Sequence, residues 1–110
     1  MRKFLSLILF FSASAVANDW SIPTELGQIN TGYKGGMILF KTTGKHHNPN
    51  SSCNAHYYSV KSDTANVNHI LSVLLAAQRS GAKIQVGVNS NTCSSDANKY
   101  IVVSRVKIHR

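Results

Sequence analysis

Acidic residues are scarce in this chain of 110 residues, which has only four Asp and Glu against twelve Lys and Arg. A glycosidase needs two carboxyl groups flanking the scissile bond, and no spacing supports a pair formed by Glu25 with Asp19 or Asp96. The fourth acid, Asp63, stands where it can cap a helix. A serine nucleophile in a Gly-x-Ser-x-Gly setting is also missing. We therefore predict a protein that is not an enzyme.

Patterns of metal ligands are lacking as well. His46 and His47 are adjacent, and neighbouring side chains on an extended loop point in opposite directions. The other histidines, His56, His69 and His109, are scattered, and no acid stands at ligand spacing from any of them. We expect no metal ion and no cofactor.

The chain has no hydrophobic run long enough to cross a bilayer core of ~30 Å. The apolar stretch Leu5–Phe11 follows the basic pair Arg2 and Lys3 and precedes the small residues Ala15-Val16-Ala17. This order is typical of a cleavable secretory signal peptide. We predict a signal peptide at residues 1–17, one domain at residues 18–110, no stable membrane span, and a secreted or periplasmic location.

Only two cysteines are present, Cys53 and Cys93, and both stand in polar stretches. Export places them in an oxidising compartment, where such a pair forms a disulfide. Closing this loop should stabilise a small domain by roughly 4 kcal/mol in the chain-entropy model.

The domain is strongly basic. Without Arg2 and Lys3, ten basic residues face four acids, which leaves a formal charge of +6. This charge favours polyanions, acidic glycans or anionic surfaces as partners.

Short apolar runs and period-two alternation predict five strands, and three- and four-residue spacing predicts one helix. The helix begins at a cap formed by Asp63 or Thr64 and ends at Ser80-Gly81, and paired glycines make residues 33–36 a turn. Polar loops are expected at residues 45–54 and 89–98, the second of which contains Cys93. The strands are expected at residues 24–31, 37–42, 56–61, 83–88 and 100–109.

The order βββαββ predicts a mainly β domain with one helix. At this length it fits a small five-stranded barrel of the OB-fold type, in which the helix covers one end. The hairpins before the helix indicate antiparallel pairing. An open α+β sandwich is the alternative.

Polar loops are the first candidates for a binding site, because amides and hydroxyls suit sugar hydroxyls. The loop from Asn89 to Asp96 offers Asn89, Asn91, Ser94 and Asp96. Faces for stacking against a sugar ring would come from Tyr33, Tyr57 and Trp20.

A basic stripe is the second candidate. Arg105, Lys107 and His109 alternate along the last strand and are followed by Arg110. Such a stripe can follow a polyanion, including single-stranded nucleic acid, although no aromatic residues are interleaved with it. The same charges can instead prevent edge-to-edge association of strands.

Two segments carry a resemblance to a known family: Gly27-Gln28-Ile29-Asn30-Thr31, and the helix-to-strand region from Ile70-Leu71 through Ser80-Gly81 to Lys83–Asn89. The chain resembles the binding (B) subunits of AB5 toxins of the subtilase-cytotoxin and typhoid-toxin kind. The resemblance implies an exported OB-fold protein, a homopentamer, recognition of sialylated cell-surface glycans and a separate catalytic subunit. It also implies that Ser21 is the nearest counterpart of a sugar-site serine in that family. The alternative is an exported OB-fold protein that binds nucleic acid or another polyanion, or has another role.

Overall fold

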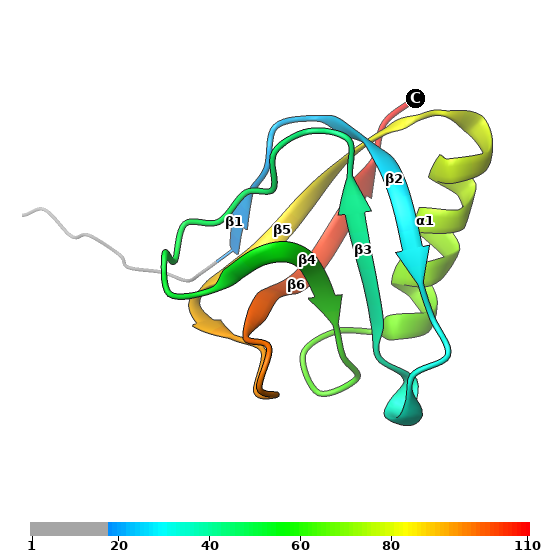
Figure 1. Cartoon of the computed structure of the whole chain (residues 1–110). Coiled ribbons are helices and arrows are strands. Elements are labelled where there is room, and N and C mark those ends of the chain that lie inside the picture. The colour runs from blue at the N-terminus through cyan, green and yellow to red at the C-terminus, as the bar shows by residue number, and fades with distance from the viewer. Residues whose placement is uncertain (1–17) are drawn as a thin grey trace, which may run out of the picture.

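The computed structural model describes residues 18–110 and contains six strands, one α-helix and one short 3-10 helix (Figure 1). The predicted signal peptide, residues 1–17, lies outside the described residues. The elements are β1 (Asn18–Trp20), β2 (Thr24–Asn30), η1 (Lys34–Gly36), β3 (Ile38–Thr42), β4 (Asn54–Val60), α1 (Val67–Ser80), β5 (Lys83–Cys93) and β6 (Tyr100–Ile108).

Five of the strands close into a barrel. The sheet order is β1-β5-β2-β3-β4-β6, and pairing of β5 with β6 completes the ring. The pair β4–β6 is parallel, and every other pair is antiparallel. This confirms the predicted order βββαββ and the OB-fold-like barrel, and it rules out the open sandwich. Strand β1 was not predicted and adds a short sixth strand alongside β5.

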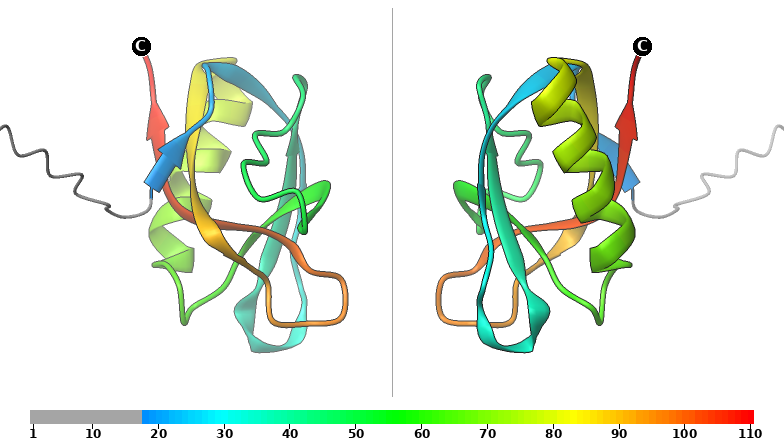
Figure 2. Two further views of the ribbon diagram at one scale, coloured as in Figure 1. Left: turned by 90° about the vertical axis from the view of Figure 1, so that its left-hand side faces the viewer. Right: turned by 90° about the vertical axis from the view of Figure 1, so that its right-hand side faces the viewer.

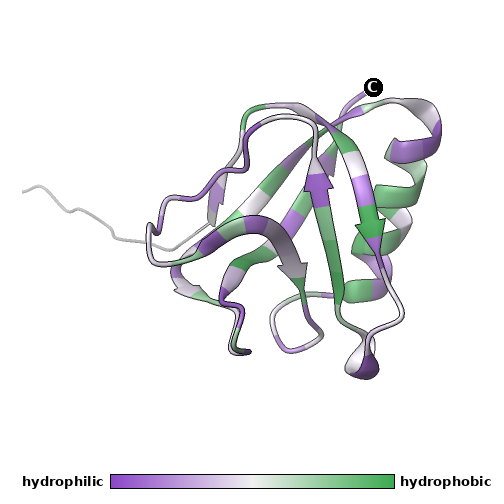
Figure 3. Ribbon diagram, in the orientation of Figure 1, coloured by the Kyte–Doolittle hydropathy of each residue, from purple (hydrophilic) through white to green (hydrophobic). Residues whose placement is uncertain are grey.

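The barrel interior is filled by alternate residues of the strands and by one face of α1, which lies against one side of the barrel (Figure 2). Hydrophobic residues follow β3, β5 and α1, whereas the connecting loops are mostly hydrophilic (Figure 3). Burial of these side chains is the main source of stability in a domain of this size. The core consists of Ile38, Phe40, Cys53, Tyr58, Val60, Ile70, Leu74, Ala77, Ile84, Val86, Val88, Ile101 and Val103.

The helix begins later than the sequence predicted. Its N-cap is Asn66, whose side chain accepts a hydrogen bond from the backbone N–H of His69. The predicted caps were wrong because Thr64 belongs to a preceding turn, in which its backbone N–H bonds to the carbonyl of Lys61. The predicted end is confirmed: Gly81 has φ of 75° and donates its N–H to Ala77.

Strand β5 is longer than predicted. It continues through residues 89–93, which the sequence assigned to a loop, and shows register shifts after Gly87 and Val88. Since β5 pairs with β1, β2 and β6, it must extend along much of the barrel. The β5–β6 loop is therefore only residues 94–99, and Cys93 ends the strand instead of lying in the loop.

The predicted disulfide between Cys53 and Cys93 is confirmed, with Cα atoms 5.3 Å apart. It joins the residue before β4 to the last residue of β5. The next residue, Asn54, donates its backbone N–H to the carbonyl of Lys99 at 2.7 Å. One end of the barrel is thereby fixed by a covalent bond and a neighbouring hydrogen bond.

A neutral histidine holds the loop between β3 and β4. Nε2 of His46 accepts the backbone N–H of Thr42 at 3.1 Å, and Nδ1 lies 2.7 Å from the carbonyl of Ala55. A backbone N–H can only donate, so Nε2 is unprotonated and the proton is on Nδ1. The imidazole packs against the buried ring of Tyr58, whose hydroxyl accepts the N–H of His47. Burial lowers the pKa of His46, with further lowering from Lys41 and His56, against an opposing effect of the Ala55 carbonyl.

Removing the disulfide should destabilise the domain. We expect Cys53→Ala/Cys93→Ala to lower the free energy of unfolding by about 2–5 kcal/mol in denaturant titrations, because the unfolded chain gains the freedom of an open loop. Reduction of the native protein should give a similar loss. A loss below about 1 kcal/mol by both routes would contradict this account.

Acidification should weaken the loop held by His46. The folded protein holds the pKa of His46 below its ordinary value of 6.5, so the unfolded chain takes up a proton first as the pH falls. The contribution of neutral His46 to the free energy of unfolding is therefore complete above the ordinary pKa of 6.5 and is lost progressively as the pH falls below it. Between about pH 7 and pH 5, the free energy of unfolding should fall more steeply for the native protein than for His46→Gln. Lys41, His47 and His56 are retained in both proteins, so equal slopes would exclude His46 as the cause.

Candidate functional site

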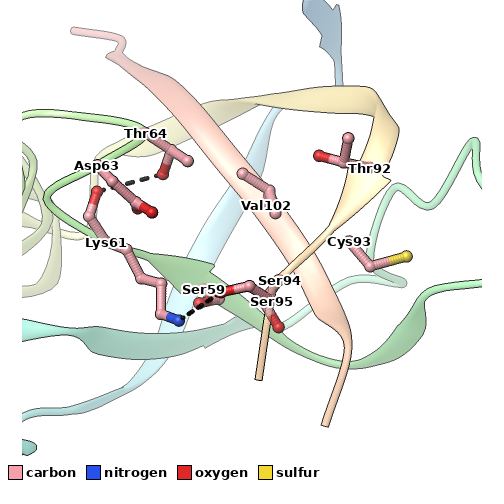
Figure 4. Close-up of a pocket in the computed structure, with 9 residues that line it drawn as sticks. All are labelled: Ser59, Lys61, Asp63, Thr64, Thr92, Cys93, Ser94, Ser95 and Val102. Carbon is pink, nitrogen blue, oxygen red and sulfur yellow. Dashed lines mark hydrogen bonds between the residues drawn. The ribbon is translucent and has the colours of Figure 1, made fainter. Parts of the chain in front are cut away.

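A pocket of about 310 Å³ lies where the β5–β6 loop approaches the beginning of α1 (Figure 4). Six of its nine residues are serine, threonine or lysine. We call it the serine pocket. It is lined by Ser59, Lys61, Asp63, Thr64, Thr92, Cys93, Ser94, Ser95 and Val102.

The hydroxyl of Ser59 is the unusual feature of this pocket. Tyr58 and Val60 point into the core, so alternation along β4 places Ser59 on the outer face. The surrounding loops cover it, and only 1% of the residue is exposed. Its Oγ has no hydrogen-bond partner among the described residues. Leaving a buried polar group unpaired costs about 1–3 kcal/mol, so such groups require an explanation.

Lys61 brings the only positive charge to the pocket lining. Its Nζ donates to Oγ of Ser95 at 3.3 Å and lies 3.7 Å from the Asp96 carboxylate. These contacts hold the ammonium group beside the serine hydroxyls. An ammonium has three donor positions, so it can also bind a ligand oxygen.

Ser94 and Asp96 brace the loop that forms one wall. Ser94 is buried, and its Oγ accepts the backbone N–H of Tyr100 at 2.8 Å and donates to Asp96 at 3.1 Å. Partial burial would raise the pKa of Asp96, but hydrogen bonds from Asn98 and Ser94 and the charge of Lys61 outweigh it, so the pKa is lowered. Both residues are therefore engaged in holding the loop.

A group of aromatic and amide side chains continues the outer face beyond the pocket. Tyr57 stands two residues from Ser59 on β4, and its ring makes an edge contact with Tyr100 of β6 at 5.4 Å. Nδ2 of Asn30 donates to the Tyr57 hydroxyl at 3.2 Å, and Nζ of Lys41 lies 4.8 Å from the ring centroid. We call this group the tyrosine platform; it comprises Gln28, Asn30, Lys41, His56, Tyr57 and Tyr100.

Strand register joins the pocket to the platform. Ser59 pairs with Leu39 of β3 on one side and with Val102 of β6 on the other. Two positions away on the same face, the residue is Lys41 in β3, Tyr57 in β4 and Tyr100 in β6. The pocket and the platform therefore form one surface on β3, β4 and β6, the kind of face on which OB folds bind oligosaccharides and oligonucleotides.

The residues predicted from the sequence do not all gather at this surface. Ser21 is buried beside β5, where its hydroxyl accepts the backbone N–H of Val86 and donates to the carbonyl of Ile22. Asn89 uses its side-chain carbonyl to accept the backbone N–H of Asn91, and both lie within β5. Tyr33 is exposed just before η1, beyond the end of β2, whereas Ser21 precedes the start of β2.

Sequence reasoning missed Ser59 and Lys61, which stand at the end of a strand with no motif around them. The only available signal was alternation, which puts Ser59 opposite to Tyr58 and Val60. The basic stripe residues Arg105 and Lys107 lie in the second half of β6. The serine pocket is at the other end of that strand.

Within residues 18–110, no helix has the length and hydrophobicity to cross a membrane. In the same part of the chain, no three His, Cys, Asp or Glu side chains form a group that could hold a metal ion. Comparison with known protein families, characterised proteins and solved structures finds no significant match to this chain. The resemblance to toxin B subunits, with its pentamer and catalytic partner, therefore stays a prediction.

Two serines of the pocket should respond oppositely to loss of their hydroxyl. Ser59→Ala removes an unpaired buried group and should raise the free energy of unfolding by about 1 kcal/mol. Ser94→Ala removes a hydroxyl with two partners and should lower it by about 1 kcal/mol or more. Denaturant titrations of the two variants provide the measurement. If Ser59→Ala were as destabilising as Ser94→Ala, its hydroxyl would have a partner and the account of the pocket would be wrong.

Proposed function

We propose that the protein is an exported sugar-binding protein that holds one sugar residue of a cell-surface glycan in the serine pocket. The observation that supports this most directly is the unpaired hydroxyl of Ser59 in a pocket rimmed by other hydroxyls. This hydroxyl is closed to solvent in the structure, so a ligand hydroxyl would supply the missing partner after side chains at the pocket opening move aside. The disulfide is typical of an oxidising compartment and agrees with a secreted or periplasmic location.

The chemistry of the walls fits a sugar better than an apolar ligand. Thr92, Ser95 and Lys61 provide donors and acceptors around the opening, while Val102 offers an apolar surface for ring C–H groups. The volume of about 310 Å³ is at the lower end of the range for small-molecule sites, which suits one sugar ring.

The tyrosine platform would bind the next residue of the glycan chain. Tyr57 and Tyr100 supply aromatic surface, although Nζ of Lys41 covers one face of the Tyr57 ring. Gln28 and Asn30 supply amides beside it. Aromatic faces and amide groups together bind sugars through C–H contact and hydrogen bonds. A glycan that extends from the pocket along β4 reaches this group within about 7 Å, the rise of two strand residues.

Binding should depend on the pocket hydroxyl and on the platform. A glycan array identifies a ligand, and calorimetry then compares the variants. We expect Ser59→Ala and Tyr57→Ala each to weaken binding by about tenfold, which is 1.4 kcal/mol. The matched controls Ser72→Ala, on the exposed side of α1, and Tyr33→Ala should bind as the native protein does.

Salt separates sugar recognition from binding by charge. Recognition through hydrogen bonds should persist at high salt and distinguish between glycans, whereas charge-driven binding should weaken steeply. Selective binding that is lost in Ser21→Ala or Asn91→Ala and retained in Ser59→Ala would contradict the proposed site. Failure of every glycan to bind would contradict the proposed function.

A further inference from the structure

A second hollow, of about 430 Å³, lies between α1 and the second half of β6. We call it the tryptophan groove. It is separate from the serine pocket, with which it shares no residue. The groove is lined by Trp20, Asn66, His69, Ile70, Val73, Ser104, Arg105, Val106 and Lys107.

The groove exists because β4 accompanies β6 for only part of its length. The β4–β6 pairing covers Tyr100 to Val102, whereas the pairing with β5 continues to Ile108. Beyond Val102, α1 takes the place of a strand beside β6. The helix is too wide to pack along the strand as closely as β4 does, and a hollow remains.

Strand β1 supplies the aromatic residue that the sequence appeared to lack at the basic stripe. Trp20 pairs with Gly87 of β5, and a Cβ at that glycine would lie only 3.1 Å from the indole ring. Glycine therefore makes room for the ring. Nζ of Lys107, on the other neighbour of β5, lies 4.2 Å from the indole centroid. The ring thus positions the ammonium group by a cation–π contact.

The positive charges of the groove are not neutralised by protein carboxylates. Arg105 and Lys107 share a strand face and stand about 7 Å apart along it. In the described part of the chain, the two ion pairs involve other residues, His47 with Asp19 and Lys61 with Asp96. The cationic groups of Arg105 and Lys107 are both on exposed residues and can bind an external anion.

We propose that the tryptophan groove binds acidic polysaccharide through its sulfate or carboxylate groups. Arg105 and Lys107 would bind successive anionic groups. From the helix side, His69 and the amide nitrogen of Asn66, whose oxygen caps α1, would bind hydroxyls. Single-stranded nucleic acid fits less well, because its binding requires free aromatic faces for the bases. Here the ammonium of Lys107 occupies one face of Trp20, and no Tyr or Phe lines the groove.

The test uses dextran sulfate, with uncharged dextran as the control polymer of the same backbone. Trp20 is the only tryptophan of the chain, so its fluorescence reports on the groove directly. Dextran sulfate should produce a saturable change in emission that weakens as salt is added, and dextran should produce none. Arg105→Gln/Lys107→Gln should weaken binding at least about tenfold. Lys45→Gln/Arg79→Gln, which removes the same two charges elsewhere, should change it less than about twofold.

Further measurements keep the two sites distinct and exclude other ligands. Ser59→Ala should bind dextran sulfate normally, so that failure at one site is not mistaken for failure at the other. Circular dichroism and unfolding midpoints should show that both double variants are folded. Equal losses in the two double variants, or binding without a change in Trp20 emission, would overturn the proposal. It would also be overturned by tighter binding to oligo-dT or to anionic lipid vesicles than to dextran sulfate.

Discussion

The disulfide between Cys53 and Cys93 is the constraint on which the candidate site depends, because it ties the start of β4 to the end of β5. Cys93 itself lines the serine pocket, and the loop that follows it forms one wall. The short parallel pairing of β4 with β6, one of the two pairings by which β6 joins the barrel, lies beside the same bond. A small domain has a limited core, so a covalent link at this position stabilises both the closure and the pocket.

Hydrogen bonding distinguishes the serines that hold the fold from the one left without a partner. Ser21 and Ser94 are buried with both donor and acceptor used, whereas Ser59 is buried with neither. Charge makes a second distinction, between the two surfaces of the barrel. The serine pocket contains one ammonium group that is partly paired with Asp96, while the two cations of the tryptophan groove pair with no carboxylate among residues 18–110. Binding at the first should therefore depend on sugar identity, and binding at the second on ionic strength.

Local patterns were sufficient to predict the architecture. Alternation at Ile84, Val86 and Val88 and helical spacing at Ile70 and Leu74 give the element order, and all five side chains are in the core. The boundaries were less accurate. The helix cap is Asn66 and not Asp63 or Thr64, because a turn that starts at Lys61 precedes the helix. Strand β5 continues to Cys93 because three other strands pair with it. Both differences arise from contacts between segments, which a propensity for helix or strand does not contain.

The sequence alone determined the fold class, the disulfide and the positive charge, because these follow from periodicity, cysteine count and composition. Tertiary structure decided which polar residues are available to a ligand. Ser21, Asn89 and Ser94 resemble binding residues in the sequence, yet their partners in the folded chain engage them. Ser59 has no distinguishing neighbours, and Trp20 is far in sequence from Lys107. Whether a hydroxyl is free and which aromatic ring meets which cation depend on strand register and loop closure, and these are set only when distant segments pack together.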